Sequence, residues 1–216
     1  MKNYQYILFD LDGTLTDSGD GIINSVAYSL DKLGVPFADR AQLYRFIGPP
    51  LVDSYEEIFG FSHEKAQTAV EYYREYYRDR GIYENSVYDG IEDVLKRLSA
   101  AGRTLLVATA KPEEFANRIL DHFHLTHYFT EIVGATFDGV RLRKDQVIAH
   151  AIALGGITDV TNAVMIGDRE HDVLGAKKYG MDCIGVLFGY GSREELNAAG
   201  AAYIAETPGD IASLLL

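Results

Sequence analysis

Two carboxylates separated by one residue follow directly after an apolar run near the beginning of the sequence. The run is Tyr6–Phe9, and the residues after it are Asp10, Leu11, Asp12 and Gly13. If strand geometry continues past the run, Asp10 and Asp12 point the same way, because alternate side chains of a strand share a face. Carboxylates beside an apolar strand repel each other and are costly to desolvate, so a cation or a proton must lie between them. Mg²⁺ suits that position, because it prefers carboxylate oxygens together with water and phosphate.

A second acidic segment follows the apolar run Ala163–Ile166. Its carboxylates, Asp168 and Asp172, are four residues apart at the beginning of a predicted helix. Taken singly, such residues are ordinary helix caps, and Asp10 and Asp12 beside a glycine are equally typical of a plain turn. Taken together, the two segments predict an acidic cluster at one edge of a sheet. Such a cluster would be destabilising alone and would become a phosphate site with Mg²⁺.

Two other segments carry groups that suit an anion. Thr109 and Lys111 stand at a predicted helix start, where a hydroxyl and backbone N–H groups form a cradle for phosphate. Lys144 opens a further predicted helix, just after a segment with two arginines. A lysine in that position, considered alone, is typical of a solvated surface charge.

The elements that must position these side chains alternate between strands and helices. Apolar runs predict strands at residues 6–9, 104–108, 131–134, 163–166, 182–187 and 203–205. Helices are predicted at residues 89–101, 112–124, 145–154 and 171–179, with short helices beginning near Ser192 and Thr207. Asp89 and Glu92 form a capping-box pattern at the first of these helices. The repeated strand–helix–strand order predicts an α/β fold with a mostly parallel sheet. Ligands bind such sheets at the carboxyl ends of the strands, where Asp10, Thr109 and Asp168 stand.

Residues 16–85 interrupt this alternation, because they show helical patterns and no convincing strand. Helices are predicted at residues 22–33, 39–46, 51–59 and 62–80. We therefore expect a helical domain of residues 16–85, inserted into an α/β core of residues 1–15 and 86–216. Tyrosines within residues 71–78 recur at helical spacing, which predicts that they pack one helix face with their hydroxyls near water.

Composition excludes several classes of protein. The 216 residues are 47% hydrophobic and 24% charged, as in an ordinary globular protein, and the formal net charge is −12. This charge argues against a nucleic-acid partner and against an anionic membrane surface. The single cysteine, Cys183, allows no intramolecular disulfide, and no apolar run is long enough for a signal peptide or a membrane span. We predict a cytoplasmic protein.

The four chemical segments, in this order and at strand ends, resemble the motifs of the haloacid dehalogenase superfamily of phosphohydrolases. The matching residues are Asp10–Thr14 for motif one, Thr109 for motif two, Lys144 for motif three and Asp168–Asp172 for motif four. The resemblance implies a Rossmann-like parallel core and identifies the helical insert as the first type of cap domain. Residues 46–51, 109–112 and 188–191 are similar to the phosphoglycolate phosphatase and bacterial 5′-nucleotidase branch. Ala110 departs from the pattern, which more usually has Ser or Asn there.

The resemblance also implies roles for these residues. Asp10 would attack phosphorus and form an aspartyl-phosphate, while Asp12 would protonate the leaving oxygen and later deprotonate water. The implied Mg²⁺ ligands are Asp10, the main-chain carbonyl of Asp12 and Asp168, with Asp172 behind them or acting through a water. The implied phosphate-binding residues are Gly13, Thr109, Ala110 and Lys144. The acid at Asp12 favours phosphomonoester hydrolysis or phosphoryl transfer between hydroxyls.

Several functions remain open on the sequence alone. A phosphatase for small soluble phosphomonoesters, acting as a monomer or weak homodimer, is our leading hypothesis. A phosphosugar mutase of the same fold is the nearest alternative, followed by a receiver-like domain phosphorylated on Asp10 without turnover and a non-catalytic binding module. The candidates for substrate specificity are Arg45, Gly48 and Lys111. Phosphoglycolate would need a cation such as Arg45 or Lys111, whereas a nucleotide would need a slot for a flat base.

Overall fold

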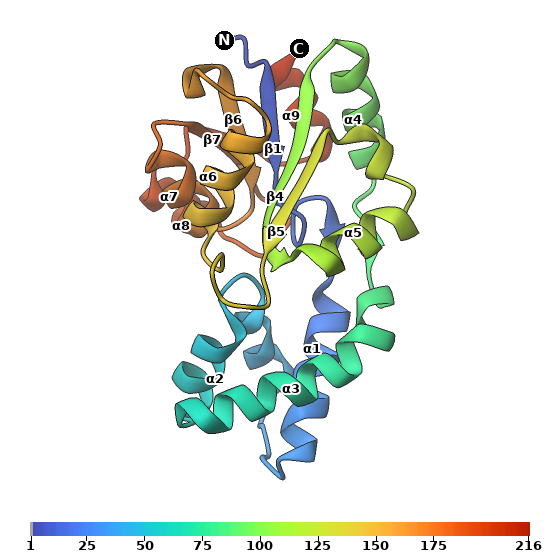
Figure 1. Ribbon diagram of the computed structural model, residues 1–216, viewed down its shortest axis with the longest axis vertical. Coiled ribbons are helices and arrows are strands. Elements are labelled where there is room, and N and C mark those ends of the chain that lie inside the picture. Colours follow the sequence, from blue (N-terminus) through green and yellow to red (C-terminus); the bar gives the residue numbers. More distant parts are fainter. Residues whose placement is uncertain (1) are drawn as a thin grey trace. The chain divides into compact units, whose positions relative to one another are not determined.

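The computed structural model describes residues 2–216, which divide into two compact units (Figure 1). The first unit comprises the chain up to Thr16 together with Val87–Leu216, and the second unit is Asp17–Ser86. The chain enters and leaves the second unit through two short strands, β2 (Thr16–Asp17) and β3 (Ser86–Val87), which form a small sheet of their own. The sequence did not predict these strands, because two residues are too few to show an alternating pattern.

A six-stranded parallel sheet forms the centre of the first unit. The strands are β1 (Tyr6–Phe9), β4 (Thr104–Pro112), β5 (Glu131–Ala135), β6 (Ala163–Gly167), β7 (Asp182–Val186) and β8 (Tyr203–Ala205). Their order across the sheet is β5-β4-β1-β6-β7-β8, with every pair parallel. The chain therefore moves outward from β1 in both directions, and β1 lies where the strand order reverses. The predicted parallel α/β fold is confirmed, and in such sheets the reversal point is where ligands bind.

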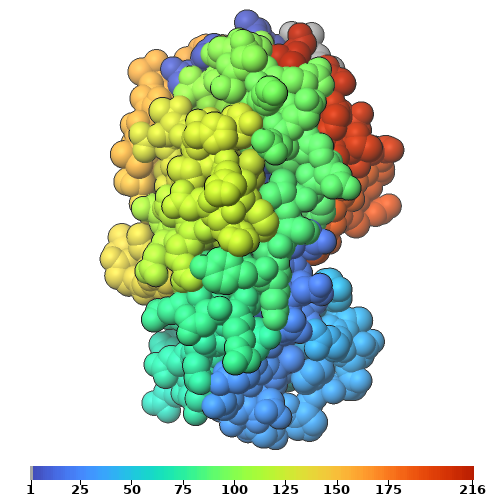
Figure 2. Space-filling model, turned by 90° about the vertical axis from the view of Figure 1, so that its right-hand side faces the viewer, coloured from blue at the N-terminus to red at the C-terminus, as the bar shows by residue number. Residues whose placement is uncertain are grey.

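Helices cover both faces of this sheet. One face carries α6 (Lys144–Leu154), α7 (Glu170–Lys177) and α8 (Arg193–Ala199). The other carries α4 (Ile91–Ala100), α5 (Glu113–His122) and α9 (Pro208–Leu215), and Figure 2 shows the side of the unit that α4 and α5 largely form. Short 3₁₀ turns, η3 (Thr126–Tyr128) and η4 (Val160–Asn162), precede β5 and β6.

Buried apolar side chains lock the central strands between these helices. On one face, Leu8, Leu106 and Met165 of the strands pack with Val147 of α6 and Val173 of α7, and all five are essentially inaccessible to solvent. Alternate residues of the same strands are buried on the other face, because a parallel sheet is covered on both sides. The ends of β1, β4 and β6 are thereby fixed in position, as a site built on them requires.

One local prediction about a helix start is wrong. Asp89 and Glu92 do not form a capping box, because α4 begins at Ile91 with Gly90 as its N-cap in the left-handed conformation and no side-chain cap. Strand β4 extends to Pro112, with a register shift between Ala108 and Pro112, so Thr109 and Lys111 lie in extended chain directly before α5, whose N-cap is Pro112.

The second unit is helical. It contains α1 (Gly19–Lys32), α2 (Leu51–Phe59) and α3 (His63–Asp79), with 3₁₀ segments η1 (Arg40–Phe46) and η2 (Gly81–Tyr83). The helix predicted at residues 39–46 is present as the 3₁₀ helix η1. Tyr73 and Tyr77 are buried on α3, and the buried hydroxyl of Tyr77 contradicts the expectation that these hydroxyls lie near water. Among residues 2–216, no helix combines the length and apolar character that crossing a bilayer requires.

Candidate active site

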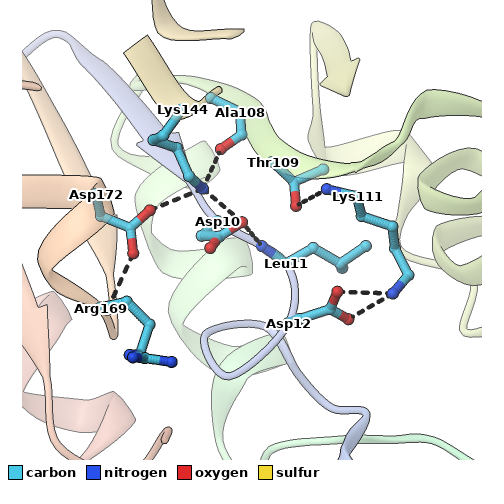
Figure 3. A network of polar contacts seen from close by, with 9 residues as sticks. All are labelled: Asp10, Leu11, Asp12, Ala108, Thr109, Lys111, Lys144, Arg169 and Asp172. Carbon is cyan, nitrogen blue, oxygen red and sulfur yellow. Dashed lines mark hydrogen bonds and ion pairs between the residues drawn. The ribbon is translucent and has the colours of Figure 1, made fainter. Parts of the chain in front are cut away.

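Four segments of the first unit meet at the carboxyl ends of β1, β4 and β6 (Figure 3). They are the loop that follows β1, the irregular end of β4, the first residue of α6 and the segment that joins β6 to α7. Parallel strands with a common direction bring their carboxyl ends to one edge, so residues far apart in sequence become neighbours there.

Lys144 is the centre of the polar network. Its Nζ lies 2.8 Å from Asp10 Oδ1 and 2.7 Å from Asp172 Oδ1, and it donates a hydrogen bond to the carbonyl of Ala108 at 3.0 Å. Lys144 is only 7% exposed, so it is no solvated surface charge. Burial alone would lower the pKa of Lys144, but the carboxylates of Asp10 and Asp172 raise it above its ordinary value. The lysine is therefore a fixed positive charge against Asp10.

Asp10 is held by backbone as well as by this lysine. Its N–H donates to the carbonyl of Ile166 at 2.9 Å, and its Oδ1 accepts a hydrogen bond from Leu11 N–H at 2.7 Å. Burial raises the pKa of the Asp10 carboxyl above its ordinary value, although Lys144 opposes the shift. A carboxylate restrained in this way is well oriented to act as a nucleophile.

Three carboxylates gather where a cation would fit. Oxygens of Asp10, Asp168 and Asp172 all lie within 4.8 Å of one another. Asp168 is 1% exposed; its Oδ2 accepts a hydrogen bond from Tyr190 N–H at 2.8 Å, while its buried Oδ1 accepts none from the described residues. Burial, with Asp172 and Asp10 nearby, raises the pKa of Asp168 well above its ordinary value. The three carboxylates exceed the charge of Lys144 by two, which matches a divalent cation in a hard oxygen site.

A glycine-rich loop, Phe188–Gly191, holds Asp168 from the other side, and we call it the glycine clasp. A Cβ on Gly189 would lie 2.2 Å from the carbonyl oxygen of Gly13 and 2.5 Å from Asp168 Cβ. A Cβ on Gly191 would lie 1.9 Å from the Asp168 carbonyl oxygen, and a Cβ on Gly13, which has φ +78°, would lie 2.2 Å from Asp168 Oδ2. Only glycine permits these approaches. Sequence reasoning missed this role, and its signal was the Gly-Tyr-Gly spacing just after β7.

Asp12 lies outside the three-carboxylate group and has a lysine of its own. Lys111 Nζ donates to Asp12 Oδ1 at 2.9 Å and to Oδ2 at 2.6 Å (Figure 3). The backbone N–H of Lys111 donates to Thr109 Oγ1 at 3.2 Å, and Thr109 is buried. Ala110, between them, is partly exposed. Lys111, which the sequence suggested for a substrate anion, is thus bound to Asp12.

The remaining specificity candidates, Arg45 and Gly48, belong to the second unit. Arg45 is exposed and pairs with Glu57 at 2.7 Å, and Gly48 has φ +107°. They are not among the residues that the first unit brings together, and their role stays a prediction.

Comparisons with known proteins give one family and relatives named for two different activities. Residues 7–186 match the model of the family described as haloacid dehalogenase-like hydrolases. A 5′-nucleotidase of Pseudomonas aeruginosa is 47% identical over 90% of this chain and 88% of its own length. The tyrosine-protein kinase PtkA of Mycobacterium tuberculosis is 43% identical over 87% of this chain but only 63% of its own length. A crystal structure described as a predicted phosphatase from Clostridium acetobutylicum superposes with a TM-score of 0.95 at 47% identity, covering 99% of both chains.

Proposed function

We propose that this chain, which belongs to the haloacid dehalogenase-like hydrolase family and is a phosphatase, hydrolyses small phosphomonoesters through a phosphorylated Asp10. The observation that carries this proposal is the pairing of a buried, restrained Asp10 with the fixed charge of Lys144 beside two further carboxylates. A nucleophile, a phosphate-binding cation and a metal site are then present within one contact network.

In the first step, a carboxylate oxygen of Asp10 attacks phosphorus and forms a new P–O bond. The bond from phosphorus to the ester oxygen breaks, and Asp12 transfers a proton to that leaving oxygen. Lys144 reduces the repulsion between the Asp10 carboxylate and the anionic phosphoryl group. We propose that Gly13, Thr109, Ala110 and Lys144 hold the phosphoryl oxygens.

In the second step, a water molecule attacks phosphorus of the phosphorylated Asp10. Asp12, now a carboxylate, takes a proton from that water, and the bond between phosphorus and the Asp10 oxygen breaks. Inorganic phosphate leaves, and Asp10 and Asp12 return to their starting states. One side chain thus serves as acid and then as base, which requires that it stay in place between the steps.

The residues that would hold a divalent ion are Asp10, Asp168 and the main-chain carbonyl of Asp12, with Asp172 next to them. When bound, Mg²⁺ would neutralise negative charge on the transferring phosphoryl group. The unpartnered Oδ1 of Asp168 and the charge excess of two in the carboxylate group support this assignment.

For the substrate, we propose a nucleoside monophosphate, with phosphoglycolate as the alternative. The 47% identity to a protein named 5′-nucleotidase favours the nucleotide. The net charge of −12 disfavours polyanions, because their repulsion adds over many phosphates. We propose that the helical second unit acts as a cap that selects the substrate.

A substrate panel tests this proposal. Phosphate release is measured from nucleoside 5′-monophosphates, phosphoglycolate and sugar phosphates, each with Mg²⁺ and with excess chelator. We expect the highest kcat/KM for a nucleoside monophosphate and loss of activity in chelator. Full activity in chelator would overturn the metal assignment, and no release from any small ester would overturn the function.

Transfer to a hydroxyl other than that of water is a second candidate. The observation that favours it is the 43% identity to a protein named tyrosine-protein kinase, and a phosphosugar mutase belongs to the same chemical class. Incubation with labelled phosphomonoester or ATP and a tyrosine peptide or sugar phosphate acceptor separates the two. Label appearing on the acceptor faster than as free phosphate would favour transfer.

A further inference from the structure

Lys111 and Asp12 form a two-point ion pair within the candidate site. Both carboxylate oxygens of Asp12 accept from the same Nζ, at 2.9 and 2.6 Å. The side chain of Lys111 is 4% exposed and that of Asp12 is 16% exposed, so the pair is shielded from solvent much more than a surface salt bridge. An ion pair with two contacts and little exposure fixes a carboxylate in position and orientation, unlike a solvated pair.

The backbone around Lys111 is extended and irregular. Strand β4 continues through residue 112, but its pairing with β5 shifts register between Ala108 and Pro112. Thr109 and Lys111 are two residues apart in this irregular extended segment, and the Thr109 hydroxyl accepts the Lys111 N–H. The lysine therefore starts from a restrained backbone at the carboxyl edge, close to the loop that follows β1.

The two carboxylates of that loop are held by two different lysines. Lys144 of α6 contacts Asp10, and Lys111 of β4 contacts Asp12. We infer that Lys111 is a positioning residue for Asp12, holding its carboxyl group where it meets the ester oxygen and later the water. This inference rests on the proposed role of Asp12 as acid and base.

The geometry favours this role over direct recognition of a substrate anion. Nζ of Lys111 already contacts both oxygens of Asp12, and its side chain is almost fully covered. A carboxylate on the substrate would have to compete with Asp12 for the same ammonium group. A residue that positions the acid acts on every substrate in proportion to how much the leaving oxygen needs a proton.

Leaving groups of different acidity therefore provide the test. Alkyl phosphates release a strongly basic oxygen that needs the proton, whereas 4-nitrophenyl phosphate releases a stable anion that does not. The ratio kcat/KM reports the steps up to release of the leaving group, so it excludes the later hydrolysis of the phosphorylated enzyme. For Lys111→Met we expect kcat/KM to fall about 30-fold with alkyl phosphates and less than about 3-fold with 4-nitrophenyl phosphate, within the range of general acid catalysis.

Three further variants make the result specific. Lys111→Arg keeps the positive charge and offers a planar guanidinium to the carboxylate, so its kcat/KM with alkyl phosphates should lie between those of Lys111→Met and wild type. Lys96→Met removes an exposed lysine of α4 and should change kcat/KM for neither class of substrate. Asp12→Asn should show the same leaving-group dependence, and adding Lys111→Met to it should cause little further loss, because both changes remove one function. Thermal unfolding confirms that each variant is folded.

The outcomes separate this inference from the proposed function. If Lys111→Met lowers kcat/KM equally for all leaving groups, or only for carboxylated substrates, Lys111 does not position Asp12. If Asp12→Asn shows no leaving-group dependence, the acid role of Asp12 itself is wrong. If Asp12→Asn shows it and Lys111→Met does not, only the inference about Lys111 is overturned.

Discussion

Asp10 and Asp12 are separated by one residue, yet they belong to different halves of the site (Figure 3). Asp10 lies with Asp168, Asp172 and Lys144, a group that we call the cation side, where carboxylates outnumber ammonium groups by two. Asp12 lies with Lys111, which we call the proton side, where the charges balance. The same chemical group thus meets two environments. The first environment has the charge excess that a divalent ion would neutralise, whereas the second is neutral and holds one carboxylate against a buried lysine.

Removing the nucleophile should have the largest effect. Asp10→Asn keeps the size of the side chain but lacks a nucleophilic oxygen, so we expect kcat to fall by at least about 10⁴-fold. The protein should remain folded, because the amide still accepts the Leu11 N–H. Steady-state kinetics and thermal unfolding of the variant check both points. Residual activity above one per cent of wild type would contradict the nucleophile assignment.

Asp168→Ala should act through the metal on the cation side. Loss of the carboxylate with the unpartnered Oδ1 should raise the apparent Mg²⁺ requirement by about 10- to 100-fold or more, the range known for groups that support metal ligands. Calorimetric titration of Mg²⁺ into the variant measures this independently of turnover. Unchanged Mg²⁺ affinity would show that the ion does not bind at Asp168.

A side chain added within the glycine clasp should lower the free energy of unfolding. In Gly189→Ala, the added Cβ meets the Gly13 carbonyl and Asp168, so the backbone must shift, at a cost of about 1–3 kcal/mol. Gly209→Ala on α9 is the matched control, because the nearest atom to its Cβ is 3.7 Å away. Denaturant unfolding of both variants compares them. Equal stability of the two variants would mean that the clasp is not tightly packed.

The stability of the metal-free protein should depend on pH with a sign opposite to that of a salt bridge, and Mg²⁺ should reverse this trend. Burial raises the pKa of Asp168 and of Asp10 above 3.8, so the folded metal-free protein retains protons that the unfolded chain has released. The contribution of these two carboxyl groups to the free energy of unfolding is fully present below about pH 3.8. It is lost as the pH rises through their raised pKa values. Mg²⁺ competes with these protons and should raise Tm more at about pH 7 than at about pH 5. An equal rise at both would contradict the prediction.

Much of this arrangement follows from the sequence because it depends on topology. The apolar runs before Asp10 and Asp168 are strands of a parallel sheet, and parallel strands place their carboxyl ends at one edge. A cluster of acidic residues at that edge could therefore be predicted without knowing any side-chain distance. The sequence pattern also marked Lys144, but its burial between Asp10 and Asp172 depends on how α6 packs on the sheet.

Features that depend on local backbone irregularity could not be predicted. Lys111, which pairs with Asp12, lies within the register shift near the end of β4, and no hydrophobic pattern encodes that shift. The clasp role of Gly189 appears only when its loop is placed against Gly13 and Asp168. For the same reason the capping box at Asp89 failed: Gly90 adopts a left-handed conformation and begins the helix itself.

Trapping the phosphorylated enzyme tests most directly whether Asp10 takes the phosphoryl group while Asp12 moves the protons. Asp12→Asn protein is mixed with 4-nitrophenyl phosphate and Mg²⁺, quenched in acid and analysed by peptide mass spectrometry. We predict that phosphate accumulates on the peptide that contains Asp10, because this leaving group needs no proton whereas hydrolysis of the acyl phosphate needs the base. The double variant with Asp10→Asn should carry none. Phosphate on another residue, or no covalent phosphate in Asp12→Asn, would contradict the division of roles between the cation side and the proton side.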